Sequence, residues 1–252
     1  MDNWFPLSKS MMEDSPEFRK LTPGEKVLWF SILSQANYRG DFYKADIEWA
    51  VELDLSLSKV RQARRKFQAL GWLSATPGWK AKGGRLATTY HYARWAKPEK
   101  GVFFARMRRY TWEWFLVGLR LVPPSLPTDR VFLRHADLLL YAYLCYFWTK
   151  FRGGGPGEHG GYVTKRLLQS ATNLQDVRCQ IEWLCGASEG LFDFRDEYHR
   201  IRLLNFTYWK DPREHEGIAE WQANDEGVLR QAIEKARARQ VAKDRSRQEP
   251  TR

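Results

Sequence analysis

Residues 53–73 read LDLSLSKVRQARRKFQALGWL, a stretch with the pattern of one helix between two clear boundaries. Ser56 occupies the N-cap position, where its hydroxyl can accept a hydrogen bond from the first free backbone N–H groups. Gly71 follows the last turn, where glycine commonly ends a helix. Apolar residues recur at helical spacing from Val60 to Phe67, so one face of this helix is expected to pack inward.

The opposite face of this helix is almost uniformly basic. A short helix and a tight turn precede it, so the stretch is predicted to be the second helix of a helix-turn-helix, which enters the DNA major groove. An alternative is a surface helix with a solvated charged face; the single sign of the charges favours DNA. We predict that Arg61 and Gln62 read bases directly. The basic residues are Lys59, Arg61, Arg64, Arg65 and Lys66, and the expected DNA contacts are Ser58, Lys59, Arg61, Gln62, Arg65 and Lys66.

The residues around this helix complete the pattern of a winged helix. Helices are predicted over about 23–36, with Thr22 as N-cap, and over about 44–53. Strand-like segments at 72–76 and 86–94 flank a glycine-rich tip that is expected to form a hairpin. Its basic residues should meet the DNA backbone or an adjacent groove and so set affinity rather than sequence preference. These residues are Lys80, Lys82 and Arg85.

The second half of the chain follows the same plan. It is predicted to contain a strand-like lead, three helices and a hairpin, at residues 101–107, 133–147, 164–171, 174–186 and 191–205. The strand-like segment at 101–107 resembles the segment around Phe5 at the start of the first half. The third helix is less basic than its counterpart, so the second unit is expected either to bind DNA more weakly or to act in dimerisation or partner binding. Its candidate DNA contacts are Lys165, Arg166, Arg178 and Arg200.

The predicted fold class is therefore α+β and mainly helical, with two winged helix-turn-helix domains in tandem and a C-terminal helical basic tail. The domain boundaries are placed at 1–97, 98–210 and 211–252. The chain has 252 residues with 41 basic and 30 acidic side chains, a net charge of +11 that favours a polyanionic partner. The tail is expected to be an exposed or frayed helix that continues into a disordered end.

The sequence gives several expectations about location and chemistry. Three cysteines indicate buried thiols in a reducing compartment, and we expect neither a signal peptide nor a membrane span, so a cytoplasmic protein is predicted. The five histidines show no metal-ligand spacing, and the glycine-rich stretch at 153–161 lacks the lysine of a phosphate-binding loop. We expect no enzyme activity, no metal and no cofactor.

The opening FPLSKSMMEDSPEFRKLTPGEKVLWFSILSQAN, residues 5–37, resembles the N-terminal winged helix of phage replisome organisers and DnaD-like primosome proteins. The tandem pattern resembles plasmid or phage replication initiators of the tandem winged-helix Rep type. The likeness covers residues 5–95 in motifs and 103–205 in layout only. It implies binding to origin repeats and recruitment of host replication or helicase-loading proteins, and it implies no catalysis.

The function expected from the sequence is specific binding to double-stranded DNA, as a replication initiator of a plasmid or phage. A winged-helix transcriptional regulator is an alternative, in which the tail could be a dimerising helix of a homodimer. A replisome scaffold that uses winged helices for oligomerisation is another alternative.

Overall fold

The structure is a computed structural model. It describes residues 4–37, 39–76, 80–81, 84–85, 89–91, 93–109, 112–113, 116, 135–151, 162–172, 177, 192–197, 200–206 and 218–246. Helices predominate among these residues, and the strands form small antiparallel sheets. The chain is therefore of the mainly helical α+β class that the sequence predicted.

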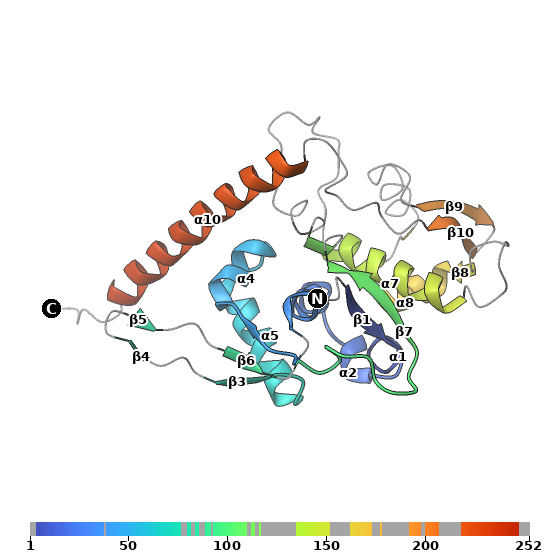
Figure 1. Ribbon diagram of the computed structural model, residues 1–252, viewed down its shortest axis with the longest axis horizontal. Helices are drawn as coiled ribbons and strands as arrows, with labels where there is room; N and C mark the ends of the chain where they lie inside the picture. The colour runs from blue at the N-terminus through green and yellow to red at the C-terminus, as the bar shows by residue number, and fades with distance from the viewer. Residues whose placement is uncertain are drawn as a thin grey trace.

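The first half contains most of the short elements (Figure 1). They are β1 (Trp4–Ser8), α1 (Lys9–Met12), α2 (Pro16–Arg19), α3 (Pro23–Gln35), β2 (Phe42–Tyr43), α4 (Asp46–Glu52), α5 (Leu57–Ala69), β3 (Ser74–Thr76), β4 (Lys80–Ala81), β5 (Gly84–Arg85) and β6 (Thr89–His91). Helices α3, α4 and α5 lie close to their predicted boundaries. The short helices α1 and α2 were not predicted, although Ser15 caps α2 by accepting a hydrogen bond from the Phe18 backbone N–H at 3.1 Å.

Local sequence explains where the main helices begin and end. Thr22 and Glu25 form a capping box at the start of α3, each side chain bonding the other residue's backbone N–H. The Ser56 hydroxyl accepts a hydrogen bond from the Lys59 backbone N–H, as predicted. Gly71 has a φ of +67°, the left-handed conformation that favours glycine, and α5 ends just before it.

The strands of the first half form a three-stranded antiparallel sheet in the order β2-β6-β3. The last strand in sequence, β6, lies in the middle, and its Tyr90 pairs with Phe42 on one side and Ala75 on the other. Strands β4 and β5 form a separate antiparallel pair between β3 and β6 in sequence. The predicted hairpin therefore consists of β3 and β6, with β4 and β5 nearer its tip.

The second half places similar elements in the same sequence order. They are β7 (Phe104–Arg108), α7 (His135–Phe151), β8 (Tyr162–Thr164), α8 (Lys165–Thr172), β9 (Phe192–Glu197) and β10 (Arg200–Phe206). Their sheet has the order β8-β10-β9, so the last strand again lies in the middle. Thr164 caps α8 as predicted, by accepting a hydrogen bond from the Leu167 N–H. The predicted helix over 174–186 and the loop over 153–161 lie outside the described residues, except for Val177.

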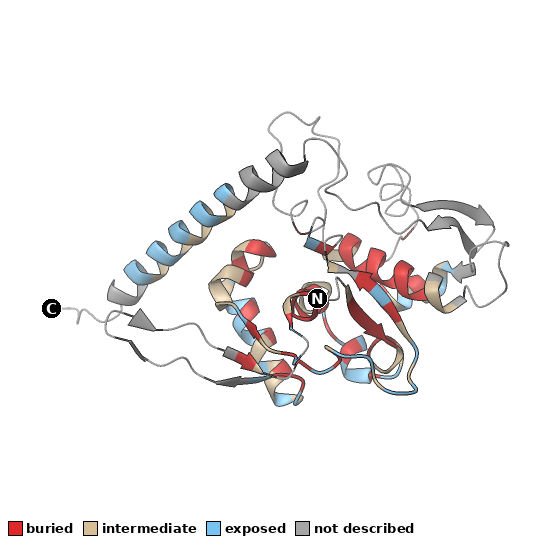
Figure 2. Ribbon diagram, viewed as in Figure 1, coloured by how far each residue is buried: buried red, intermediate tan, exposed pale blue. Residues whose placement is uncertain are grey.

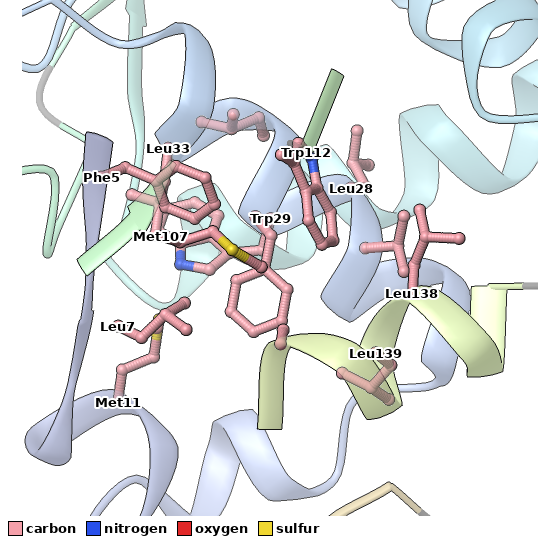
Figure 3. Packing of buried hydrophobic residues seen from close by; sticks show 14 of the residues in the cluster. Phe5, Leu7, Met11, Leu28, Trp29, Leu33, Met107, Trp112, Leu138 and Leu139 are labelled. Atoms are coloured by element: carbon pink, nitrogen blue, oxygen red, sulfur yellow. The ribbon is translucent and has the colours of Figure 1, made fainter. Parts of the chain in front are cut away.

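The two halves share one hydrophobic core. The strands that open the two halves, β1 and β7, pair with each other in antiparallel fashion, with Phe5 opposite Met107 and Leu7 opposite Ala105. Helices α3 and α7 pack together, and both are buried on nearly every side, which explains their continuous apolar sequences. Figure 3 shows side chains from both halves meeting there, among them Phe5, Leu7, Leu28, Trp29, Met107, Trp112, Leu138 and Leu139.

The C-terminal part is a continuous helix, α10 (Ile218–Ser246), that lies against α4. A helix predicted in the C-terminal part is present over this range, and residues 247–252 lie outside the described part. Figure 2 shows that its described portion is exposed or only half-buried. No helix among the described residues is both long enough and apolar enough to cross a membrane.

Candidate nucleic-acid interface

Helix α5 is fixed to the body of the protein along its predicted apolar face. Val60, Ala63 and Phe67 are all buried. The Phe67 ring stacks on Trp72 at a centroid distance of 5.9 Å and meets the Trp29 ring edge-on at 4.9 Å. This packing holds α5 against both α3 and the start of the hairpin. The direction in which its outer face points is therefore set by the core.

The outer face of α5 exposes five of the six residues predicted to contact DNA there. These are Ser58, Lys59, Arg61, Gln62 and Arg65. The helix contains five basic residues and no carboxylate of its own. Lys59 and Arg65 make no ion pair with any other described residue, and the neutral Gln62 side chain is exposed between them. The helix thus presents hydrogen-bond donors and positive charge together on one exposed surface.

Three of the five basic residues of α5 form ion pairs with carboxylates of other helices, so the basic face predicted for α5 is only partly free. Arg64 is only 24% exposed, and its Nε lies 2.9 Å from Asp46 Oδ1 at the start of α4. Lys66 Nζ lies 3.1 Å from Glu25 Oε1 in the first turn of α3. Arg61 Nε lies 3.8 Å from Asp46 Oδ2, with the side chain 46% exposed. The carboxylates come from preceding helices, so spacing within α5 alone gave no sign of them.

Asp46 is the residue that joins α4, α5 and the sheet. Besides its ion pair with Arg64, it accepts a hydrogen bond from the Tyr90 hydroxyl at 3.0 Å, and Tyr90 stacks on Phe42 at 4.7 Å. Burial and the neighbouring Asp46 carboxylate raise the pKa of Tyr90 above its ordinary value. Tyr90 therefore stays protonated and donates to Asp46, and it serves as a packing residue of the sheet.

We expect Asp46→Asn to lower the free energy of unfolding by about 1–2 kcal/mol, because it leaves the half-buried Arg64 guanidinium without its counter-ion. The asparagine oxygen can still accept from Tyr90, so the loss reports the ion pair. Urea unfolding followed by circular dichroism measures it. Glu48→Gln, which removes the same charge from the same turn of α4, should change stability by less than about 0.5 kcal/mol because its partner Arg237 is exposed. Equal losses in both variants would contradict this assignment.

The hairpin that was predicted to form the wing is only partly described. Lys80 on β4 pairs with Arg85 on β5 in the register of the strands, so two of its three predicted basic residues lie directly opposite each other. Lys82 lies outside the described residues. In Figure 1 this strand pair extends away from the body of the protein.

The candidate DNA contacts of the second half gather at one end of its sheet. Lys165 and Arg166 begin α8 directly after Thr164, and Arg200 is opposite Thr164 in the register of β10 with β8. Arg178 lies outside the described residues. Figure 1 shows β8, α8 and β10 far along the molecule from α5 and the first hairpin. The candidate contacts of the two halves therefore lie in separate parts of the molecule.

The acidic partners of α5 and the proximity of α10 to α4 were not predicted. Helix α4 contains three carboxylates, and each is paired: Asp46 with α5, Glu52 with Lys44, and Glu48 with Arg237 of α10. The signal was present in the acidic composition of residues 46–52, opposite a basic α5 and a basic α10. No cluster of metal-ligating side chains occurs among the residues that the structure describes.

Comparisons with protein families, with curated proteins and with solved structures find no match to this chain.

Proposed function

We propose that the chain binds double-stranded DNA, with α5 as the recognition helix in the major groove and the β3–β6 hairpin as a wing against the backbone. The observation that carries this proposal is α5 itself. One face is buried in an aromatic core, and the other exposes Lys59, Gln62 and Arg65 with no competing ion pair among the described residues. Arginine and glutamine can each form two hydrogen bonds with a base edge in the major groove.

The arrangement of elements supports a tandem winged-helix architecture. In the first half, three helices (α3, α4 and α5) are followed by two strands, and a short strand after the first helix joins their sheet. The second half has the same strand order, with β8 at one edge and β10 in the middle. The second half is proposed to bind DNA through the basic group at Lys165, Arg166 and Arg200.

The biological role that we propose is replication initiation of a plasmid or phage, with host replication proteins as partners. This role follows from the resemblance of residues 5–37 to phage replisome proteins and from the doubled winged-helix pattern. A transcriptional regulator would use the same DNA contacts at a promoter, and a replisome scaffold would bind DNA without sequence preference. Footprinting on DNA from the protein's own locus separates them. Protection of short repeats beside an AT-rich stretch supports the initiator.

We expect Gln62→Ala and Arg65→Ala each to weaken binding to the protected site about 10- to 100-fold, because each removes contacts to base edges or to the adjacent phosphates. Fluorescence anisotropy with a duplex of that site measures the loss. Arg19→Ala, at an exposed arginine on α2, is the matched control and should leave affinity unchanged. Wild-type binding that the α5 substitutions leave intact would exclude α5 as the recognition helix.

A further inference from the structure

The longest helix of the protein, α10, contacts the body through the outer side of the helix-turn-helix. It packs against α4, and Arg237 of α10 forms an ion pair with Glu48 near the start of α4. Leu229, Ala232, Ile233 and Ala236 are partly buried, and their helical spacing places them on one face of α10. Ile47 and Val51, also partly buried, flank Glu48 on the outer side of α4. Helix α10 is therefore seated on α4 by a narrow apolar stripe and one ion pair.

This seating leaves most of the basic side chains of α10 in solvent. Arg230, Lys235 and Arg239 are exposed and form no ion pair with another described residue. Figure 2 shows the exposed side of α10 along its described length. The α5 residues Lys59, Gln62 and Arg65 are exposed with α10 in place. Helix α10 thus adds positive charge beside the candidate interface without covering it.

The position of α4 in a helix-turn-helix indicates which partner this charge fits. When the second helix enters the major groove, the first helix crosses the DNA backbone. A phosphate chain approaching α4 would meet the carboxylates of Asp46 and Glu48, and the structure neutralises both with arginines. In Figure 1, α10 continues past α4 toward the side on which β4 and β5 lie.

We infer that α10 is a third DNA-contacting element, which binds the phosphate backbone flanking the groove that α5 enters, through Arg230, Lys235 and Arg239. This inference rests on the proposed DNA-binding function. Phosphate contacts add affinity and salt dependence without sequence preference. The same helix also neutralises Glu48 of α4 through Arg237.

The test compares the salt dependence of duplex binding by the full-length protein and a variant with Arg230, Lys235 and Arg239 all replaced by alanine. Each phosphate contact contributes about 0.9 to the slope of log K against log salt concentration, so the slope should fall by roughly 2 to 3 between about 50 and 200 mM salt. Affinity at the lower salt concentration should fall at least tenfold, equally for a mixed-sequence duplex and for the protected site. These residues are exposed, so the urea midpoint should match that of the wild type.

A matched control removes three exposed basic residues outside α4, α5 and α10, in the variant Arg19→Ala, Lys20→Ala, Lys100→Ala. Its net charge equals that of the α10 variant, and its slope should stay at the wild-type value. An equal fall in both variants would show a general charge effect and overturn the inference. A wild-type slope in the α10 variant would also overturn it, while leaving the proposed function intact. Failure of the wild-type protein to bind either duplex would overturn the proposed function itself.

Discussion

Replacing Trp72 with alanine is expected to lower the free energy of unfolding by about 3–5 kcal/mol, the cost typical of truncating a buried aromatic side chain. Trp72 is fully enclosed at the junction between α5 and β3. Its ring lies 5.0 Å from Trp95, 5.5 Å from Trp29 and 5.9 Å from Phe67, measured between centroids. The substitution leaves a cavity bounded by three rigid rings, which cannot easily collapse to fill it.

The loss of the Trp72 ring should also weaken the proposed DNA binding, because this ring stacks on Phe67 at 5.9 Å and helps to hold α5 in place. Alanine keeps the backbone hydrogen bonds of Trp72 to Phe67 and Arg94, so the effect reports the ring. Urea unfolding followed by circular dichroism gives the stability change. Tyr43→Ala is the matched control: this ring is 70% exposed on β2, at the far edge of the same sheet, and its removal should cost less than about 0.5 kcal/mol. A Trp72→Ala midpoint equal to that of the control would show that the aromatic cluster contributes little to stability.

Local signals in the sequence were sufficient for the three main helices of the first half, α3, α4 and α5, although not for the short helices α1 and α2. The Thr22 and Ser56 caps and Gly71 fixed the ends of α3 and α5, because a cap depends on residues within one turn. The apolar spacing of Val60, Ala63 and Phe67 correctly predicted the buried face of α5. Charge alone did not show which basic residues are free. The partners of Arg64 and Lys66 come from other helices, and such pairs depend on the tertiary arrangement.

The contacts between the two halves were not predicted either, because they also depend on the tertiary arrangement. The two leads were noticed as similar, but their pairing with each other as β1 and β7 links residues about a hundred positions apart. Arg109 also links the two halves and donates to the Ala36 carbonyl at 2.8 Å, at the end of α3. The predicted boundary near residue 97 therefore falls between two segments whose strands pair and whose buried side chains share one core.

Lys26 lies where α3 of the first half meets α8 of the second half, and we expect it to make the stability of the protein depend on pH. Its side chain is fully buried in α3, and Nζ donates to the Ala171 carbonyl at 3.0 Å, near the end of α8. Phe18 and Tyr143 face it, with Nζ 5.8 and 5.9 Å from their ring centroids. No carboxylate among the described residues pairs with it. Burial lowers its pKa from 10.5 to about 8, because removing the ammonium from water disfavours the charged form.

The sign of the effect follows from proton binding. Below pH 8 both the folded and the unfolded chain hold the Lys26 proton, whereas between pH 8 and 10.5 only the unfolded chain holds it. Stability attributable to this group should therefore rise with pH across that window, by about 3 kcal/mol in total. Lys26→Met keeps the length of the side chain without the charge. It should be about 2 kcal/mol more stable than the wild type at pH 7, after the lost hydrogen bond of about 1 kcal/mol is counted.

The decisive quantity is the difference in unfolding free energy between wild type and Lys26→Met at pH 7 and again at pH 10. Titration of other lysines and of the tyrosines destabilises both proteins alike at high pH and cancels in this difference. We expect the advantage of the methionine variant to shrink by about 2 kcal/mol or more as pH rises from 7 to 10, because the wild-type amine is then neutral in the folded state. A methionine variant that is less stable than wild type by the same amount at both pH values would mean that Lys26 is a favourable hydrogen-bond donor without a desolvation cost. In that case burial between α3 and α8 would not disfavour the charged form of Lys26.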